Sequence, residues 1–297
     1  MPVYNAGGFL RAAIESILHQ TFTDFELIII NDGSTDESEQ VAQSFAERDH
    51  RIRLVTQQNQ GLTTTLNTLL LLSRGQYIAR MDQDDVSSPD RLEKQVAFLN
   101  NHTDVGLVGS WVEVISPTNI HLTVHRYPVS DSGIKQMMLL QNPFAHGAVM
   151  MRPNPAIIYR KEFDYAEDFD RWVQLAATTK FINLPFILYH WRASEQGMSS
   201  KYSTKQRQAT DQILKRTRNS FPNKSFFSSN EKYEMLAEIY YRGKLKSLLS
   251  TLRVATILCT SGSISWAFQI IRNFVVSLLL SNSKETKIQA NTMFTSS

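Results

Sequence analysis

Short apolar runs alternate with helical patterns along the first 115 residues, and this alternation limits the chain to few folds. The runs cover residues 25–30 (FELIII), 51–56 (RIRLVT), 77–81 (YIARM) and 105–115. The run 25–30 is typical of a strand that is covered on both faces, and the other three are also predicted to be strands. Because helical patterns separate them, the sequence predicts an α/β fold in which helices flank a mostly parallel sheet.

Helices are predicted in the gaps between these strands. One helix carries Val41 and Phe45 and begins at Thr35 or Asp36, either of which can cap it. Mixed patterns follow residue 115, and the chain becomes helical near its end. The other predicted helices cover 10–18, 61–72, 88–99 (with Ser88 as N-cap and Pro89 first in the helix), 131–140, 165–177 and the region from 203, and the later strands cover 122–127, 146–152 and 181–191.

Three carboxylates follow the third predicted strand directly, namely Asp82, Asp84 and Asp85. In an open α/β sheet, ligands bind at the carboxyl ends of the strands. Carboxylate oxygens at such a place suit Mg²⁺ or Mn²⁺, which usually take further ligands from water and substrate phosphates. The alternative is a solvated acidic turn before a helix, which is a common arrangement.

Carboxylates also occur at two other informative places. Asp32 follows the first strand, where it can accept hydrogen bonds from a base or a ribose, or form part of a glycine turn. Glu167 and Asp168 open a predicted helix, and one of them can be a general base if it faces the same cleft as Asp84. They can also simply complement the helix dipole. Because that dipole favours the anion, we expect a base that stays ionised at neutral pH.

Two segments with histidine lie further along the chain. His146 precedes a predicted strand and can line a cleft or be a structural residue. His190, Trp191 and Arg192 end the last predicted strand. Arg192 could clamp a phosphate while Trp191 stacks on a sugar or base, or the segment could be an ordinary strand end with an amphipathic tryptophan.

Taken in order, these segments resemble glycosyltransferase family 2, the inverting enzymes of the GT-A fold. The resemblance covers about residues 1–200, in the stretches PVYNAGGFLRAAIESILHQTFTDFELIIINDGSTDES, NQGLTTTLNTLLLLSRGQYIARMDQDDVSSPDRLEKQVAFL, NPFAHGAVMMR, YAEDFDRWVQLA and LYHWR. It implies a GT-A-type α/β fold with a Rossmann-like nucleotide-sugar half over about 1–115 and an acceptor half over about 116–200. Residues 201–297 would then form a basic helical appendage.

The resemblance assigns the donor side of the site. It implies that Pro2, Tyr4 and Asn5 lie by the nucleotide and that Asp32 contacts the base or its ribose. The donor is expected to be a nucleoside diphosphate sugar, most often a UDP-sugar.

The same resemblance assigns the metal and the chemistry. Asp82 and Asp84 match the family's Asp-x-Asp motif, which implies that Asp84 coordinates Mn²⁺ or Mg²⁺ and that Asp82 faces the ribose or the metal. Asp85 would support the site or touch the donor sugar.

The acceptor side is assigned in the same way. Asp168 matches the family's catalytic base, with Glu167 as the fallback, and His146 and Arg192 would lie near the acceptor or the diphosphate.

The resemblance implies an inverting, metal-dependent glycosyltransferase of bacterial surface polysaccharide or lipopolysaccharide synthesis, acting on a saccharide or a lipid-linked saccharide. One alternative is an inactive family member that only binds a partner. Another is a nucleotidyltransferase, which also places carboxylates and Mg²⁺ at strand ends. The segment Asn5–Gly8 disfavours the latter, because it lacks the basic, glycine-rich loop that holds a triphosphate.

Two departures from the family pattern concern the first strands. Family members usually have an apolar strand before the Pro-x-Tyr-Asn segment, whereas this sequence begins at Met1. We therefore expect the functional protein to begin upstream. Asn31 stands where many members carry a second aspartate.

Basic residues are concentrated in the last third of the chain. Residues 1–200 contain 16 Lys and Arg against 23 Asp and Glu, whereas residues 201–297 contain 15 against 5. The apolar stretch 264–280 includes Arg272, which is costly inside a bilayer, so we expect no membrane span. It predicts either an amphipathic helix on the catalytic body or peripheral contact with anionic lipid. No aromatic–basic stripe indicates nucleic-acid binding.

Location is predicted from the cysteine content and the first residues. Cys259 is the single cysteine, which excludes an intramolecular disulfide framework and fits a reducing compartment. The first residues show no basic segment followed by an apolar run, so we expect no signal peptide. The expected location is cytoplasmic, with peripheral contact at the inner face of the membrane.

Overall fold

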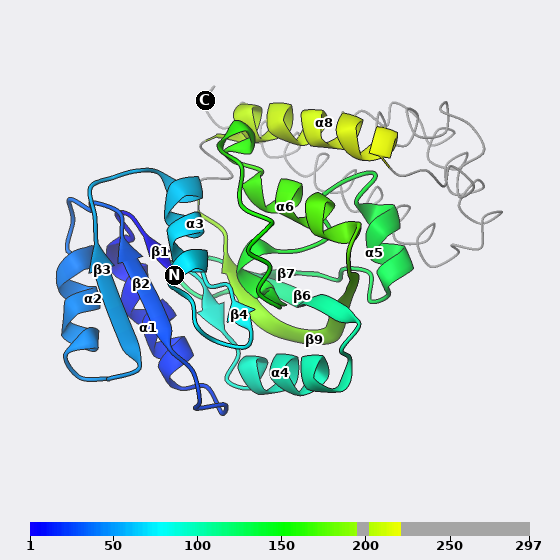
Figure 1. The fold of residues 1–297 in the computed structure, drawn as a ribbon. Coiled ribbons are helices and arrows are strands. Elements are labelled where there is room, and N and C mark those ends of the chain that lie inside the picture. Colours follow the sequence, from blue (N-terminus) through cyan, green and yellow to red (C-terminus); the bar gives the residue numbers. More distant parts are fainter. Residues whose placement is uncertain (195–201, 221–297) are drawn as a thin grey trace, which may run out of the picture. The chain divides into compact units, whose positions relative to one another are not determined.

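In the computed structural model, the first 56 residues form a parallel sheet with the strand order β1-β2-β3. Each strand of this sheet is short, and helices connect them (Figure 1). The elements are β1 (Pro2–Val3), a 3₁₀ turn (Gly7–Phe9), α1 (Leu10–Leu18), β2 (Leu27–Asn31), α2 (Ser38–Ala46) and β3 (Ile52–Thr56). All five residues of β2 are buried, as expected for a strand covered on both faces.

The structure describes residues 1–194 and 202–220, and all structural statements concern these residues. They belong to one unit, which spans residues 1–220. The rest of the predicted tail, with its apolar stretch 264–280, lies outside the described residues. Within the described part, no helix combines the length and the apolar character that a bilayer crossing needs.

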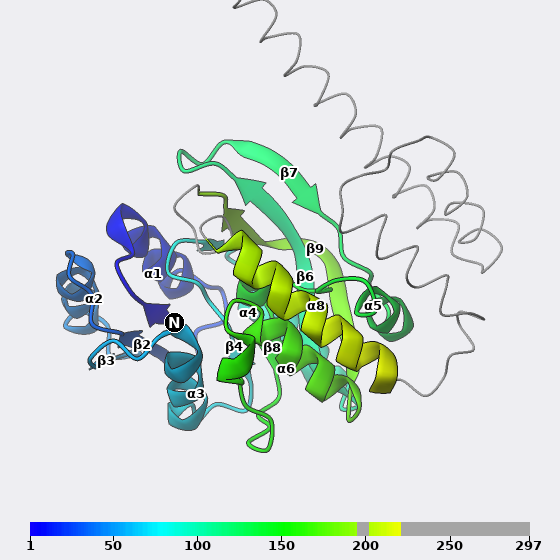
Figure 2. The same cartoon turned by 90° about the horizontal axis from the view of Figure 1, so that it is seen from above.

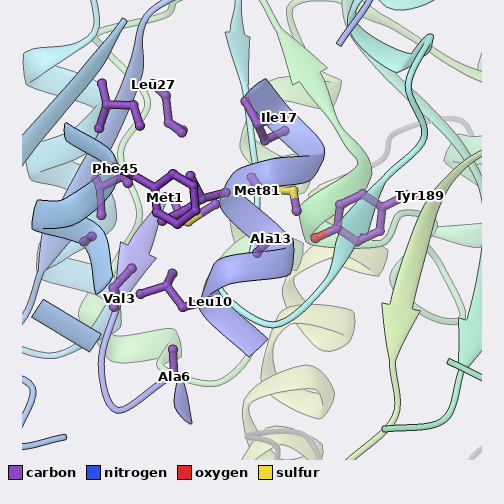
Figure 3. Packing of buried hydrophobic residues seen from close by; sticks show 14 of the residues in the cluster. Met1, Val3, Ala6, Leu10, Ala13, Ile17, Leu27, Phe45, Met81 and Tyr189 are labelled. Atoms are coloured by element: carbon purple, nitrogen blue, oxygen red, sulfur yellow. The ribbon is translucent and has the colours of Figure 1, made fainter. Parts of the chain in front are cut away.

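The amphipathic helix α1 joins the parallel sheet to the rest of the molecule. Its apolar residues recur every three or four positions, and Leu10, Ala13 and Ile17 are buried against the sheet. Figure 3 shows these side chains in one cluster with Met81 and Tyr189, which come from the second half of the fold. The core therefore runs without a break from the first sheet to the strands that carry the candidate site.

The second sheet is mixed, with the order β4-β8-β6-β9-β5, and β7 also pairs with β6. Its long central strands, β6 and β9, are parallel, and its other pairs are antiparallel. The prediction of an α/β fold with a parallel sheet flanked by helices is confirmed, and parallel pairing is confined to β1–β3 and to β6 with β9. The strands are β4 (Ile78–Ala79), β5 (Val86–Ser87), β6 (Val105–Ile115), β7 (His121–His125), β8 (Met150–Met151) and β9 (Lys180–Arg192).

Helices cover both faces of this second sheet. Helix α4 lies on one side of β6 and β9 and α6 on the other, with α8 packed on α6 (Figures 1 and 2). Because α8 packs on α6, the first helix after position 200 belongs to the same unit as the strands. The helices are α3 (Leu62–Leu72), α4 (Arg91–Asn101), α5 (Asp131–Met137), α6 (Glu167–Ala176) and α8 (Ser203–Ser220).

Two predicted helix starts are wrong by a few residues. Helix α4 begins at Arg91, because the Ser88 hydroxyl lies 3.2 Å from the Ile187 carbonyl oxygen on β9 and does not cap the helix. Helix α2 begins at Ser38 with Glu37 at the N-cap. Asp36 accepts hydrogen bonds from the Ser38 and Gly7 N–H groups at 3.0 Å each, so it ties α2 to the first loop.

The predicted strand over 146–152 is also mostly absent. A 3₁₀ turn covers His146–Ala148, and only Met150 and Met151 pair as a strand. This turn places His146 and Gly147 against the candidate site. By contrast, β9 continues through Pro185, with an irregular register opposite Ser110 and Trp111 of β6.

The start of β1 is tied into the first sheet by the chain's first residue. The Met1 amino group lies buried and donates a hydrogen bond to the Ile28 carbonyl oxygen at 2.7 Å. Burial lowers the pKa of this amine to about 4.

Candidate active site

The loop between β4 and β5 carries Asp82, Asp84 and Asp85, and buried contacts hold it in place. The Tyr189 hydroxyl accepts a hydrogen bond from the Asp82 N–H at 3.2 Å and donates one to Asp85 Oδ2 at 2.8 Å. The other oxygen of Asp85 accepts the Arg192 N–H at 2.7 Å. Burial and the nearby Asp82 and Asp84 raise the pKa of Asp85 well above its usual value. Asp85 thus ties the loop to Tyr189 and Arg192 of β9, and its part in donor binding stays a prediction.

Arg192 holds the same loop from the other side. Its Nε donates to the Asp84 carbonyl oxygen at 2.8 Å, and Nη1 donates to the Ser116 carbonyl oxygen and to Asn119 Oδ1. The residue is 4% exposed, and its guanidinium stacks on the Phe9 ring. These contacts show how Arg192 fixes the loop, whereas its contact with a diphosphate stays a prediction.

Asp82 and Asp84 form a pair of carboxylates whose chemistry fits a divalent cation. Asp82 pairs with Arg80 at 2.7 Å and keeps about a third of its side chain exposed. Burial raises the pKa of Asp84 to about 6, and repulsion from the Asp82 carboxylate adds to this shift. A cation with hard oxygen ligands would relieve that repulsion. In the described ranges no group of three or more His, Cys, Asp or Glu is arranged to hold a metal ion.

Gln83 joins this loop to the predicted nucleotide segment. Its Oε1 accepts the Tyr4 N–H at 2.7 Å, and its Nε2 donates to the Tyr4 carbonyl oxygen at 3.2 Å. Asn5, in a left-handed conformation with φ of 49°, accepts the Thr35 N–H at 2.8 Å. Pro2 lies in β1 opposite Ile30. The structure therefore brings the first residues next to the carboxylate loop and to the end of β2.

Asp32 has a structural task in the described chain. It is 3% exposed, and its carboxylate accepts hydrogen bonds from the Gln60 N–H (2.8 Å), the Gly61 N–H (2.9 Å) and the Gln57 side chain (2.7 Å). It thereby fixes the entry to α3, where Gly61 needs a φ of 84° that only glycine adopts readily. Contact of Asp32 with a base or ribose stays a prediction.

Glu167 and Asp168 open α6 as the sequence predicts, but the pKa of each carboxyl is raised, whereas the helix N-terminus alone would lower it. Burial raises the pKa of Asp168 to about 6, and burial together with the Asp168 charge raises that of Glu167 to about 8. Desolvation of the carboxylates outweighs the helix dipole, which acts mainly at exposed ends. Asp168 Oδ2 accepts a hydrogen bond from Asn142 at 2.7 Å. Glu167 Oε2 is buried and has no hydrogen-bond partner in the described chain.

His146 lies behind this acidic pair. Its Nε2 is 3.0 Å from the Tyr159 hydroxyl, and its Nδ1 is 4.0 Å from Glu167 Oε1. Burial and the charges of Arg80 and Arg171 lower the pKa of His146 well below its usual value, so the ring is neutral at pH 7. The structure thus brings His146 to Glu167, while its contact with acceptor or diphosphate stays a prediction.

Arg80 lies near both the Asp82 loop and the acidic pair that opens α6, and its role was not predicted from the sequence. Its guanidinium pairs with Asp82, and its charge also lowers the pKa of both Glu167 and Asp168. The residue is 6% exposed, and its Nε is buried without a partner in the described part. The available signal was a charged residue inside the apolar run 77–81.

Gly147 is required where the Asp82 carboxylate meets the Tyr189 ring. A Cβ at Gly147 would lie 1.9 Å from the Tyr189 hydroxyl oxygen and 2.7 Å from Asp82 Oδ2. We expect Gly147→Ala to cost about 1–3 kcal/mol in the free energy of unfolding, as overpacking does, and to displace Asp82. Urea denaturation measures the loss. The Cβ would also lie 2.3 Å from Tyr189 Cζ, a ring atom that phenylalanine keeps, so the same change should still be destabilising in the background Tyr189→Phe. No loss of stability in either background would contradict this account.

The comparisons with known proteins fit this geometry. A family model described as Glycosyl transferase family 2 matches residues 1–164. The O-antigen biosynthesis glycosyltransferase WbnJ of Escherichia coli is 32% identical over 181 residues, which cover 59% of this chain and 69% of WbnJ.

Two solved structures share the fold. The Staphylococcus aureus TarS 1–349 complex with UDP-GlcNAc has a TM-score of 0.58 and 15% identity, covering 95% of this chain and 90% of that chain. Mannosyltransferase PcManGT of Pyrobaculum calidifontis, in complex with GDP-Man and Mn²⁺, has a TM-score of 0.53 and 14% identity, covering 92% and 85%.

Proposed function

The chain belongs to glycosyltransferase family 2, and from this premise we propose that it transfers a sugar from a nucleoside diphosphate sugar to an acceptor hydroxyl, with inversion at the sugar's C1. One observation carries the proposal. Two pairs of carboxylates lie close to Arg80, namely Asp82 with Asp84 and Glu167 with Asp168. The Arg80 charge pairs with Asp82 and lowers the pKa of the other three. One pair suits the leaving diphosphate and the other suits the attacking hydroxyl.

Asp168 is the proposed general base. With a pKa of about 6 it is mostly ionised at pH 7, yet it is more basic than an ordinary aspartate. The hydrogen bond from Asn142 orients its carboxylate. Glu167, with a pKa of about 8, holds a proton at neutral pH, so the pair carries close to one negative charge. Direct attack by the acceptor oxygen inverts C1, and no second nucleophile is needed.

On the donor side, Asp84 and Asp82 would hold Mn²⁺ or Mg²⁺. A bound cation would neutralise the charge that grows on the departing diphosphate. Arg80 keeps Asp82 in place, and Gln83 keeps Tyr4 beside the carboxylate loop. The UDP-GlcNAc bound to TarS and the GDP-Man and Mn²⁺ bound to PcManGT support a nucleotide sugar and a divalent metal.

The setting is proposed to be the synthesis of a bacterial surface polysaccharide or lipopolysaccharide, which the similarity to WbnJ supports. The experiment is a donor screen, in which UDP-, GDP-, CMP- and dTDP-sugars are offered and the release of the nucleotide is measured with Mn²⁺ or Mg²⁺ present. Release from at least one nucleoside diphosphate sugar is expected. No release from any of them, with or without saccharide acceptors, would contradict the proposal.

We also propose that the basic C-terminal region contacts anionic membrane at the inner face. Its 15 Lys and Arg against 5 Asp and Glu over residues 201–297 support this, because each basic residue near an anionic surface adds about 1 kcal/mol of attraction. The full chain should co-sediment with phosphatidylglycerol vesicles, and deleting 250–297 should weaken the binding. Raised salt should weaken it as well, by screening. Equal binding to neutral vesicles would contradict the electrostatic basis.

A further inference from the structure

An exposed row of rings lies on the same face of the second sheet as Tyr189. Side chains alternate between the two faces of a strand, so Tyr189 and Trp191 of β9 share one face. The register places Tyr189 next to Val112, and Val112 next to His125 of β7, which puts His125 on that face too. The rings confirm this, since the His125 centroid is 6.1 Å from Trp191 and 6.3 Å from Tyr127. We call Trp191, His125 and Tyr127 the aromatic strip.

The aromatic strip is open at the surface. Trp191 is 37% exposed, which is unusual for so large a ring on a central strand, and the side chain of His125 is also exposed. Aromatic rings with one exposed face have apolar surface to offer a ligand.

One end of the strip begins at the carboxylate loop. Tyr189 holds Asp82 and Asp85 through its hydroxyl, and Arg192 holds Asp85 through its N–H. Trp191 stands between these two residues in the strand. A spacing of two residues along a strand is about 7 Å, so the Trp191 ring lies about one sugar ring away from Tyr189.

The other end of the strip approaches the proposed base. Tyr127 packs against the same apolar cluster as Ala145. The next residue, Pro128, shares a hydrogen-bond donor with Pro143, because Asn183 Nδ2 donates to both carbonyl oxygens. Asn142, which precedes Pro143, is the residue that hydrogen-bonds Asp168. The strip therefore begins two residues from Tyr189, which holds the carboxylate loop, and ends at Tyr127, whose neighbour Pro128 is joined through Asn183 to the segment before Phe144.

We propose that the aromatic strip binds the acceptor saccharide, with the C–H faces of one or two pyranose rings packed on Trp191 and His125. Sugar rings have apolar C–H faces and polar edges, and water released from both surfaces favours such contacts. The donor is a poorer occupant, because the predicted nucleotide residues lie on β1 and at the end of β2, in the other sheet. In Figure 2 β7 lies on the far side of β6 from β1–β3. This inference rests on the proposed function.

The test uses methyl glycosides of the common hexoses and N-acetylhexosamines, in both anomers, as probes of the full-length chain. Saturation-transfer-difference NMR, with Mn²⁺ replaced by diamagnetic Mg²⁺ and with UDP or GDP present, measures their dissociation constants. We expect Trp191→Ala to weaken the binding glycoside about tenfold and Trp191→Phe, which keeps a ring, only two- to threefold. The matched control is Phe186→Ala, an exposed ring on the same strand that packs on Lys94 and should change nothing.

Binding of UDP and GDP is measured on every variant by calorimetry, and folding by circular dichroism. If no glycoside of the panel binds the wild-type chain, or if Trp191→Ala binds it as tightly as the wild type, the strip is not the acceptor site. Loss of nucleotide binding in Trp191→Ala would place Trp191 on the donor side and also overturn the inference. Failure of the wild-type chain to bind any nucleoside diphosphate would instead contradict the proposed function itself.

Discussion

Asp84→Ala should abolish sugar transfer while the chain stays folded. The carboxylate is the proposed metal ligand, and a metal at the leaving diphosphate contributes several kcal/mol of transition-state stabilisation, which corresponds to at least about 10³-fold in rate. Because burial raises the pKa of Asp84, its removal relieves repulsion with Asp82 and should not lower the free energy of unfolding. Nucleoside diphosphate release measures activity, and thermal unfolding checks the fold.

A nearby carboxylate provides the matched control. Asp90 follows the same loop but pairs with Lys94 on the surface of α4, so Asp90→Ala should keep near-normal turnover. For the wild type, excess EDTA should stop transfer, and Mn²⁺ or Mg²⁺ should restore it. Protons compete with the metal for Asp84, so the metal concentration needed for half activity should rise as the pH falls through about 6. Full activity in EDTA would remove Asp84 from this role.

The second large effect is expected at the base. Asp168→Asn should lower kcat by about 10²–10⁴, the usual contribution of a positioned general base. Binding of the donor should change little, because the base meets the acceptor hydroxyl. The measurements are kcat at saturating metal and the dissociation constant of UDP or GDP.

The variant Glu167→Gln and the pH dependence of kcat show which of the two carboxylates is the base. Since Glu167 holds a proton at neutral pH, Glu167→Gln mimics its protonated form and should have a milder effect. A base must be ionised, so kcat at saturating metal should rise with pH through about 6, and this limb should vanish in Asp168→Asn. A large loss in Glu167→Gln with a small loss in Asp168→Asn would reverse the roles. Small losses in both would mean that the base lies elsewhere.

Local patterns were enough to predict β2, β3 and the helices of the first sheet, but not β1, which has only two residues. The run before Asn31 became β2, and the apolar spacing at Leu10, Ile14 and Ile17 became α1, because one strand and one amphipathic helix each carry their own signal. The position of the carboxylates at 82–85 after a strand was also predicted, because an apolar run followed by polar residues indicates the end of a strand.

The contacts that hold the site could not be predicted in the same way. Tyr189 meets Asp82 across more than a hundred residues, and Arg91 of α4 donates hydrogen bonds to the carbonyl oxygens of Arg80 and Val149. Such pairs depend on which distant strands become neighbours in the second sheet, which no local period encodes. The raised pKa of Asp168 was missed for the same reason, since burial is a property of the whole fold.

Gln83 has a thermodynamic consequence for how a cation and a nucleotide change each other's affinity. Its two hydrogen bonds join Tyr4 to the Asp84 loop, so we expect a ligand that orders either segment to order both. Coupling of this kind is reciprocal: whatever factor a cation adds to the affinity for a nucleotide, the nucleotide must add to the affinity for the cation. In Gln83→Ala this factor should shrink equally in the titration with the cation and in the titration with the nucleotide. The two ligands would then bind more independently of each other.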